Sequence, residues 1–478
     1  MGIKKNFLYS SILTSAGYIF PLITYPYVSR VLGVSNIGIC NFVDSVINYF
    51  LLFAMMGIRT IGIREIARCQ GNKEEMSRTF FSVFLLNLLF VIIFGGLLLI
   101  SIQIVPQFAE HKQLMYIGVM KLLATFLMVE WLFKGVEDFK YITKRSLIIR
   151  CFYVLSVFIF VRKPDDYPVY FFLLISTEAI NALINCIYAK KYIYFTVRNL
   201  HPFAYFKSSL ILGCYGLLTT MYTTFNVVYL GFVSTPTQVG YYTTATKLHH
   251  IILAFFTAFT GVMMPRMSHY LSEGNYKEFG KKINDSLAIL IYTSFPIMVI
   301  GIFFAPEIIR IISGSGYEGA IPSLVIVMPL IFIIGAEQIL VMQTLMPLKK
   351  DRAILINSLA GALVGIGLNF LLVSHWGSSG SAIVWLCSEL SVMTSAIIFV
   401  RKIVSFSGVT KKITKNLLLA IPPVIVCLIL RVIEINAFVS LFLAMLVIAI
   451  YYSYMYLFVI KDSVILSILP KRLNIQKR

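Results

Sequence analysis

The sequence is a succession of apolar runs, each about as long as a helix that crosses a lipid bilayer. A helix spans the hydrocarbon core in about 20 residues, and this rule predicts fourteen spans. They lie near residues 8–29, 37–57, 80–102, 114–133, 146–161, 168–189, 209–233, 242–264, 286–305, 323–346, 353–373, 381–400, 417–433 and 438–460. Hydrophobic residues make up 59% of the 478 residues and charged residues only 13%, about half the charged share of a soluble domain. The pattern predicts an all-α integral membrane protein.

The basic residues predict which side of the membrane each connection faces. With the N-terminus inside, 33 of the 41 Lys and Arg lie in inner segments and 7 in outer ones, while Lys121 lies within a span. Cytoplasmic loops of membrane proteins carry such an excess, so both termini are predicted to be cytoplasmic. The same bias accounts for most of the net charge of +20, so no nucleic-acid partner is expected.

The sequence has no pattern typical of a metal site, a cofactor site or an enzyme. The seven cysteines are scattered without a C-x-x-C, and the adjacent His249 and His250 would point about 100° apart on a helix. No P-loop, G-x-S-x-G or H-E-x-x-H stands at a usable position. The longest connection has about 20 residues, which excludes a soluble catalytic domain. We therefore expect no catalytic residue, no metal and no cofactor.

Two short motifs recur about 200 residues apart. LGVSNIG at 32–38 and LGFVSTPTQVG at 230–240 each join two spans on the outer side, and GNKEE at 71–75 and GNYKE at 274–278 each join two spans on the inner side. Six predicted spans separate the copies, so both copies have the same orientation. This predicts a parallel repeat about an axis along the membrane normal.

The repeat predicts the domain organisation. Residues 1–205 and 206–405 are expected to form two six-helix lobes related by a pseudo-two-fold axis, and residues 406–478 add two spans and a basic cytoplasmic tail. Two lobes around such an axis indicate a transporter that works by alternating access, with its substrate held between the lobes. A duplicated helical scaffold without transport is the simpler alternative.

The stretch EWLFKGVEDFKYITKRSLIIR at 130–150 resembles a segment of polysaccharide-biosynthesis flippases. The matching residues are Glu130, Trp131, Phe133, Gly135, Glu137, Asp138, Lys140, Tyr141 and Ile142. PLITYPYVSRVLG in the first span and the run from Leu230 to Lys247 are similar to the same proteins. The resemblance covers about residues 1–405 and is to the Wzx-type oligosaccharide flippases of the multidrug/oligosaccharidyl-lipid/polysaccharide exporter superfamily.

This resemblance implies the movement of undecaprenyl-pyrophosphate-linked oligosaccharide units across the bacterial inner membrane, for O-antigen, capsule or exopolysaccharide synthesis. It also implies coupling to an H⁺ or Na⁺ gradient, contact with membrane lipids, and partnership with a polysaccharide polymerase and its chain-length machinery. Relatives often carry an acid in the seventh span where this sequence has Asn226. An amide releases no proton, so coupling at that position is not expected here.

Two other functions remain open at this point. A multidrug or cation antiporter of the same superfamily would favour acidic sites within the membrane, and acids do outnumber bases in the predicted spans. A membrane-embedded polysaccharide polymerase would need a sizeable outer loop with catalytic residues, whereas the outer connections here are under about 20 residues.

Charged residues inside the spans are candidates for function, because each costs about 2.5–3.5 kcal/mol to insert. The candidates for ion coupling are Asp44, Glu178, Glu337 and Glu389. The candidates for the substrate cavity are Arg30, Arg59, Lys121, Lys247, Tyr25, Tyr241 and Tyr242. The alternatives are snorkelling to the headgroups for Arg30, an interfacial position for Arg59, and packing or an interfacial position for each tyrosine.

Depth in the membrane predicts one contact. Asp44 and Lys121 each lie seven residues from the outer end of their span, which puts both about 10 Å below the outer surface at 1.5 Å per residue. Opposite charges at one depth in one lobe are expected to pair. The pair could be a static support or part of the transport cycle.

The topology is testable with reporter fusions. A fusion at Asn436 should report the outer side, and one at Gly274 the inner side, because of the bias of Lys and Arg. Activity of paired periplasmic and cytoplasmic reporters measures both. A swapped pair of signals would contradict the predicted topology.

Overall fold

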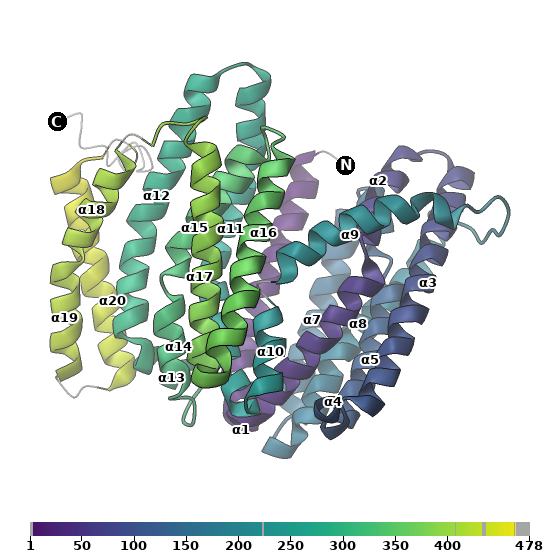
Figure 1. Cartoon of the computed structure of the whole chain (residues 1–478), viewed down its shortest axis with the longest axis horizontal. Helices are drawn as coiled ribbons and strands as arrows, with labels where there is room; N and C mark the ends of the chain where they lie inside the picture. The colour runs from purple at the N-terminus through teal and green to yellow at the C-terminus, as the bar shows by residue number, and fades with distance from the viewer. Residues whose placement is uncertain (1–2, 222–223, 407, 433–435, 463, 465–478) are drawn as a thin grey trace. The chain divides into compact units, whose positions relative to one another are not determined.

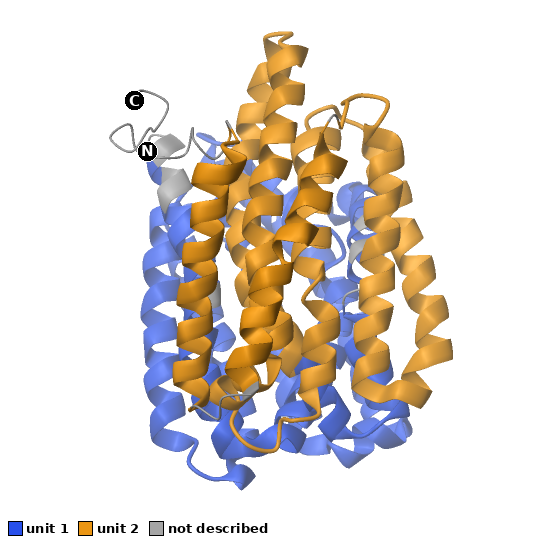
Figure 2. Cartoon of the chain, turned by 90° about the vertical axis from the view of Figure 1, so that its left-hand side faces the viewer, with its two compact units in different colours: residues 1–243 blue, residues 244–478 orange. Residues whose placement is uncertain are grey.

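The computed structural model describes all residues except 1–2, 222–223, 407, 433–435, 463 and 465–478, and every regular element in the described part is helical (Figure 1). The chain divides into two compact units, residues 1–243 and 244–478 (Figure 2). The first unit contains α1 (Ile3–Met55), α2 (Ile58–Arg68), α3 (Lys73–Ile104), α4 (Pro106–Glu110), α5 (Lys112–Leu127), α6 (Glu130–Gly135), α7 (Phe139–Phe160), α8 (Tyr167–Ala189), α9 (Phe206–Met221), α10 (Phe225–Val233) and the start of α11 (Pro236–Ser272).

In its described residues, the second unit contains the rest of α11 and nine further α-helices. They are α12 (Tyr276–Phe303), α13 (Ala305–Ile312), α14 (Ala320–Val327), α15 (Leu330–Leu340), α16 (Asp351–Leu368), α17 (Ser374–Val400), α18 (Val409–Leu419), α19 (Ile421–Val432) and α20 (Ala437–Tyr454). Short 3₁₀ segments at Pro164–Asp166 and Pro202–Tyr205 precede α8 and α9. One-turn π-helical segments extend α15, α16 and α20 at Val341–Leu345, Asn369–Val373 and Met455–Ile460.

The helices confirm the predicted all-α membrane fold. Among the described residues, ten helical segments are long and apolar enough to cross a membrane. Two of them, Tyr9–Met55 and Asp351–Val400, have 47 and 50 residues, enough for two crossings each. Each turns at a glycine with positive φ, Gly33 at 75° and Gly377 at 53°. Together with α7 and the pair α9–α10, these segments account for the fourteen predicted spans.

The repeated inner turns have the same local structure in each unit. Gly71 and Gly274 have φ of 92° and 69°, in the left-handed region that glycine adopts without a Cβ penalty. The next residues, Asn72 and Asn275, cap α3 and α12, because each side-chain oxygen accepts hydrogen bonds from backbone N–H groups of the first turn. The Gly-Asn dipeptide therefore recurs because both copies begin a helix with the same turn and the same N-cap.

The repeated outer turns contact each other within the first unit. A Cβ on Gly38 would collide with the backbone oxygen of Pro236, and a Cβ on Gly240 would collide with the backbone oxygen of Val34. Position 38 corresponds to 240 and position 34 to 236, both at an offset of 202 residues. The contact is thus reciprocal, as it is at an interface between two-fold-related copies.

A side-chain hydrogen bond follows the same relation. The Nδ2 of Asn41 donates to the Oγ1 of Thr243 at 2.8 Å, and these two residues are again 202 positions apart. Residues on the predicted two-fold axis are expected to contact their own counterparts in this way. The two lobes and their boundaries stay a prediction, which this contact supports.

The last two helices pack against α12 in the second unit. Tyr292 on α12 lies in one apolar cluster with Cys427 on α19 and with Ile448 and Tyr456 near the end of the chain. The hydroxyl of Tyr292 also donates to Asp462 at 2.9 Å. The expected appendix of two spans is therefore attached to the unit through a continuous core.

The reciprocal glycine contact predicts the effect of small substitutions. Gly38→Ala and Gly240→Ala should each destabilise the fold by about 1–3 kcal/mol, because the added methyl group overlaps backbone that cannot rotate away. The measurement is the midpoint of thermal unfolding of the purified protein. Gly96→Ala is the matched control, since a Cβ there meets nothing within 4 Å. Equal midpoints for all three variants would contradict the close contact.

Candidate functional site

A cavity of about 500 Å³ lies in the first unit among α1, α2, α5, α8 and α9. Seven polar or charged residues stand among the residues that line it. The lining residues are Asn48, Leu51, Leu52, Met55, Gly57, Arg59, Thr60, Lys121, Thr125, Met128, Glu178, Leu212, Gly213, Gly216 and Thr220. Three of the predicted site residues, Arg59, Lys121 and Glu178, are thus brought to one cavity.

The Asp44–Lys121 pair confirms the contact predicted from equal depth. The Nζ of Lys121 lies 2.6 Å from Oδ1 of Asp44 and 2.9 Å from Oδ1 of Asn48. Asn48 also donates from Nδ2 to Oδ2 of Asp44 at 3.0 Å, so the three side chains close a ring of hydrogen bonds. The Lys121 side chain is 8% exposed and that of Asp44 is 27% exposed. The ammonium group is therefore buried, while the carboxylate keeps partial access.

Glu178 adds a second acid to the same wall. Its Oε2 accepts a hydrogen bond from the Thr125 hydroxyl at 3.2 Å, and its charge interacts with those of Lys121, Asp44 and Arg59. Arg59 is exposed, one residue into α2. The cavity region thus combines two acids with two basic groups, one buried and one accessible.

The other candidates of the first unit lie away from this wall. Arg30 is exposed on α1 and donates from Nη1 to the backbone oxygen of Pro26 at 2.8 Å; the described residues that line the cavity do not include it. Tyr25 and Tyr242 are buried, and Tyr241 is half-buried. Asn226, where coupling is not expected, is fully buried and donates from Nδ2 to the hydroxyl of Tyr242 at 3.3 Å.

The second unit holds the remaining candidates. The carboxyl groups of Glu337 on α15 and Glu389 on α17 lie next to each other. The indole Nε1 of Trp385 donates to Oε1 of Glu389 at 2.9 Å, and the ring of His249 packs edge-on against that indole with centroids 5.0 Å apart. Lys247 is half-buried on α11, two residues before His249. Two acids, a tryptophan and a histidine thus form a polar cluster within the helices of this unit.

Several polar residues of these sites escaped the sequence analysis. Asn48 follows Asp44 by four positions on one helix, which places both on one face, and this spacing could have identified it. Arg145 lay just before the predicted fifth span, and Arg150 lay in the first few residues of that span without being named as a candidate. In the structure Arg145 is buried and hydrogen-bonded to Asn185, and Arg150 donates to the backbone oxygen of Leu13 at 3.3 Å.

The first-unit cavity can bind an anion and can move charge. Arg59 offers an accessible guanidinium, and guanidinium groups bind phosphate oxygens through two donors at once. Lys121 offers a buried ammonium group that an incoming anion could contact if Asp44 released it. A metal site is not indicated: within the described residues, no group of three or more His, Cys, Asp or Glu side chains has suitable geometry.

The sequence matches two known protein families over most of its length. Residues 3–271 match the family described as Polysaccharide biosynthesis protein, and residues 214–371 match the family described as MatE. A protein of Escherichia coli (strain K12) named "Putative O-antigen transporter" is 26% identical over 407 residues, which cover 84% of this chain and 97% of the relative. A Shigella dysenteriae protein of the same name is 24% identical and covers 82% of this chain and 98% of the relative.

Solved structures show the same fold. "Lipid II flippase MurJ, inward closed conformation" superposes with a TM-score of 0.77 at 16% identity, covering 95% of this chain and all of that one. The inward-facing conformation of a multidrug resistance MATE family transporter of the MOP superfamily superposes with a TM-score of 0.62 at 14% identity, covering 86% of this chain and 98% of that one. The expectation of a multi-pass membrane protein is confirmed, and the relatives and solved structures that the chain resembles are named transporters or flippases.

The family match covers more than half of the chain, from the first span to the end of α11, and the curated relatives extend it over four fifths. It includes the segment 130–150, which resembles polysaccharide-biosynthesis flippases. The chain belongs to the polysaccharide biosynthesis protein family.

Proposed function

We propose that the protein is a flippase that moves undecaprenyl-pyrophosphate-linked oligosaccharide units across the bacterial inner membrane by alternating access. Its termini are cytoplasmic in this proposal, and its product feeds a surface polysaccharide such as O-antigen, capsule or exopolysaccharide. The family match and the names of the curated relatives support the substrate class. The observation that carries the proposal is the cavity with Arg59 and the Asp44–Lys121 pair, which is suited to a pyrophosphate.

The cation–acid arrangement suggests how the substrate could be held and released. A pyrophosphate that enters the cavity first meets the exposed Arg59 and then competes with Asp44 for the ammonium group of Lys121. Asp44 would be left without its partner, and a proton or Na⁺ could neutralise it. In this proposal the ion gradient is coupled through Asp44 and Glu178 in the first unit, and through Glu337 and Glu389 in the second.

The remaining candidates have supporting roles in the proposal. Arg30 could attract the pyrophosphate through its exposed guanidinium group, and Lys247 could add a further positive charge. Tyr25, Tyr241 and Tyr242 could stack on sugar rings, although the burial of Tyr25 and Tyr242 favours packing. Sugar rings would then be recognised by half-buried side chains such as Tyr241.

A multidrug or cation antiporter is the second candidate. Residues 214–371 match the MatE family, and the adjacent carboxyl groups of Glu337 and Glu389 would suit a cationic ligand. The buried lysine of the first-unit cavity argues against this alternative, because a cationic drug would be repelled by Lys121 unless Asp44 stayed in place.

The flippase proposal is tested by deleting the gene. The deletion strain should accumulate lipid-linked sugar units on the inner leaflet and lose the mature surface polysaccharide, and the wild-type gene on a plasmid should restore both. Extraction of the lipid-linked sugars and a protease- or lectin-based assay of their leaflet measure the result. Normal polysaccharide in a deletion strain without a second flippase would favour the antiporter.

Variants of the Asp44–Lys121 pair test whether the pair has a structural role or a role in transport. Asp44→Asn should destabilise the protein by about 3 kcal/mol, because it leaves the buried Lys121 charge without its partner, and Lys121→Met should destabilise it less, because Asp44 keeps partial access to solvent. The double variant Asp44→Asn/Lys121→Met should recover in abundance but still accumulate lipid-linked sugar. Protein level and the lipid-linked sugar pool are measured together.

Lys112→Met is the matched control for this experiment, since Lys112 is exposed at the start of the same helix. It should change neither abundance nor the sugar pool. If flipping recovers together with abundance in the double variant, the pair is only structural. If the single effects simply add in the double variant, the two residues are not coupled energetically.

A further inference from the structure

A second cavity lies in the first unit at the start of α7 and the end of α8. It has a volume of about 630 Å³ and shares no lining residue with the cavity of Lys121. Four basic residues and one acid line it, a net charge of +3, together with aromatic and aliphatic side chains. The lining residues are Asp138, Lys140, Tyr141, Lys144, Arg145, Ile148, Ile149, Ile184, Tyr188 and Lys191.

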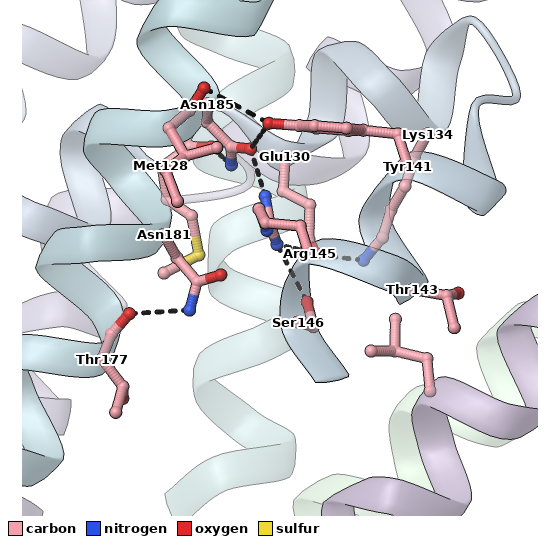
Figure 3. A network of polar contacts seen from close by, with 12 residues as sticks. Met128, Glu130, Lys134, Tyr141, Thr143, Arg145, Ser146, Thr177, Asn181 and Asn185 are labelled. Atoms are coloured by element: carbon pink, nitrogen blue, oxygen red, sulfur yellow. Dashed lines mark hydrogen bonds and ion pairs between the residues drawn. The ribbon is translucent and has the colours of Figure 1, made fainter. Parts of the chain in front are cut away.

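The buried wall of this cavity is fixed by a polar network centred on Arg145 (Figure 3). The Arg145 side chain is 5% exposed. It donates to Oδ1 of Asn185, to the Ser146 hydroxyl at 3.1 Å and to Oε1 of Glu130 at 3.4 Å. Glu130 is shared, because its other oxygen lies 3.2 Å from Nζ of Lys134. The positive charge of Arg145 is therefore incompletely balanced, and among the described residues its Nε has no hydrogen-bond partner.

The aromatic wall holds the one acid of the cavity. Tyr188 and Tyr192 donate their hydroxyls to Oδ2 of Asp138 at 2.9 and 2.7 Å, and the ring of Tyr188 stacks on that of Tyr141 with centroids 3.7 Å apart. Burial acts to raise the pKa of Asp138, but these hydrogen bonds and the charge of Lys191 lower its pKa below the ordinary value. The acid is thus occupied by the wall, which leaves Lys140 and Lys144 for a ligand. Lys191 donates to the Tyr188 hydroxyl at 3.1 Å, and its ammonium group has two further N–H donors for the same ligand.

Apolar side chains continue from the cavity along the two helices. Ile148 and Phe152 on α7 are 56% and 65% exposed, and Ile184 and Ile187 on α8 are 37% and 69% exposed. Positions four apart on α7, and three apart on α8, lie on one helix face, and α7 and α8 are in contact. A basic pocket thus sits at the end of an apolar surface that would face lipid tails.

We infer that this cavity binds the headgroup of an anionic phospholipid, with Lys140, Lys144 and Lys191 around the phosphate and the acyl chains along Ile148 and Ile184. Basic pockets beside spans on the cytoplasmic side typically bind anionic lipid headgroups, and the bias of Lys and Arg predicts this end to be cytoplasmic. A phospholipid fits better than the transported lipid, because the apolar surface is exposed on the outside of α7 and α8, away from the lining of the Lys121 cavity. This inference does not depend on the proposed function.

The experiment uses the full-length protein purified in detergent. Native mass spectrometry measures the affinity for phosphatidylglycerol and for neutral phosphatidylcholine. The variant Lys140→Gln/Lys144→Gln/Lys191→Gln should bind phosphatidylglycerol about a hundredfold more weakly, since each lysine near a lipid headgroup contributes about fivefold. Lys140→Arg/Lys144→Arg/Lys191→Arg keeps the charge and should retain binding. Unfolding midpoints without lipid show whether the variants fold.

The matched control is Lys277→Gln/Lys281→Gln/Lys402→Gln, which removes three exposed lysines from the second unit. Equal weakening in this control would show only general attraction to positive charge and would overturn the inference. Equal affinity for phosphatidylcholine would also overturn it. In a parallel titration, undecaprenyl pyrophosphate replaces the phospholipid. Undecaprenyl pyrophosphate could bind where phosphatidylglycerol does not, and only the variant Lys140→Gln/Lys144→Gln/Lys191→Gln could lose that binding. In that case the cavity is a substrate subsite and the phospholipid assignment is wrong.

Discussion

Hydrocarbon does not tolerate an unbalanced charge, and this constraint organises both units. A charged residue in a span costs about 2.5–3.5 kcal/mol to insert into the membrane. The ionisable residues of the spans accordingly lie next to other ionisable or polar groups. In the first unit Lys121 is held by Asp44 and Asn48, with Glu178 close by. In the second unit Glu337 and Glu389 lie side by side, and such a pair of acids needs a proton or a cation to balance it. Opposite charges can be separated by an incoming anion. Like charges repel, and a proton or cation between them relieves the repulsion. The first arrangement therefore suits a phosphate-bearing substrate, and the second suits a coupling ion.

The membrane spans, and the depth of each residue within its span, could be predicted from the sequence because they depend on local length and hydropathy. Length and hydropathy locate a helix in the bilayer, and the fixed rise per residue converts a position into a depth, which is why the contact of Asp44 with Lys121 could be foreseen. The direction in which a side chain points depends on packing, which the sequence does not reveal. Arg30 illustrates this limit: its guanidinium group donates to the backbone oxygen of Pro26 on its own helix. Arg145 illustrates another, because the predicted span began just after it.

The segment 130–150 shows what a resemblance can and cannot convey. Its similarity to known flippases identified the family without explaining the residues. In the structure Glu130, Asp138 and Arg145 of this segment connect α6, α7 and α8. Asp138 caps α7 and accepts from tyrosines on and just after α8, and Arg145 is tied to Asn185. These partners lie at least 40 positions further along the chain, so no local pattern reveals them. The same joint supplies the walls of the basic cavity.

The two repeated motifs differ in how their structure arises. Each Gly-Asn turn, predicted to lie on the inner side, is complete in itself, because the glycine adopts positive φ and the asparagine caps the helix that follows. One copy is enough to predict that structure. The outer turn has its close contacts with its own counterpart: Gly38 meets Pro236, Gly240 meets Val34, and Asn41 donates to Thr243. Its glycines are required by the approach of another backbone, so only the comparison of both copies reveals their role. A duplicated sequence can thus specify a contact that neither copy specifies alone.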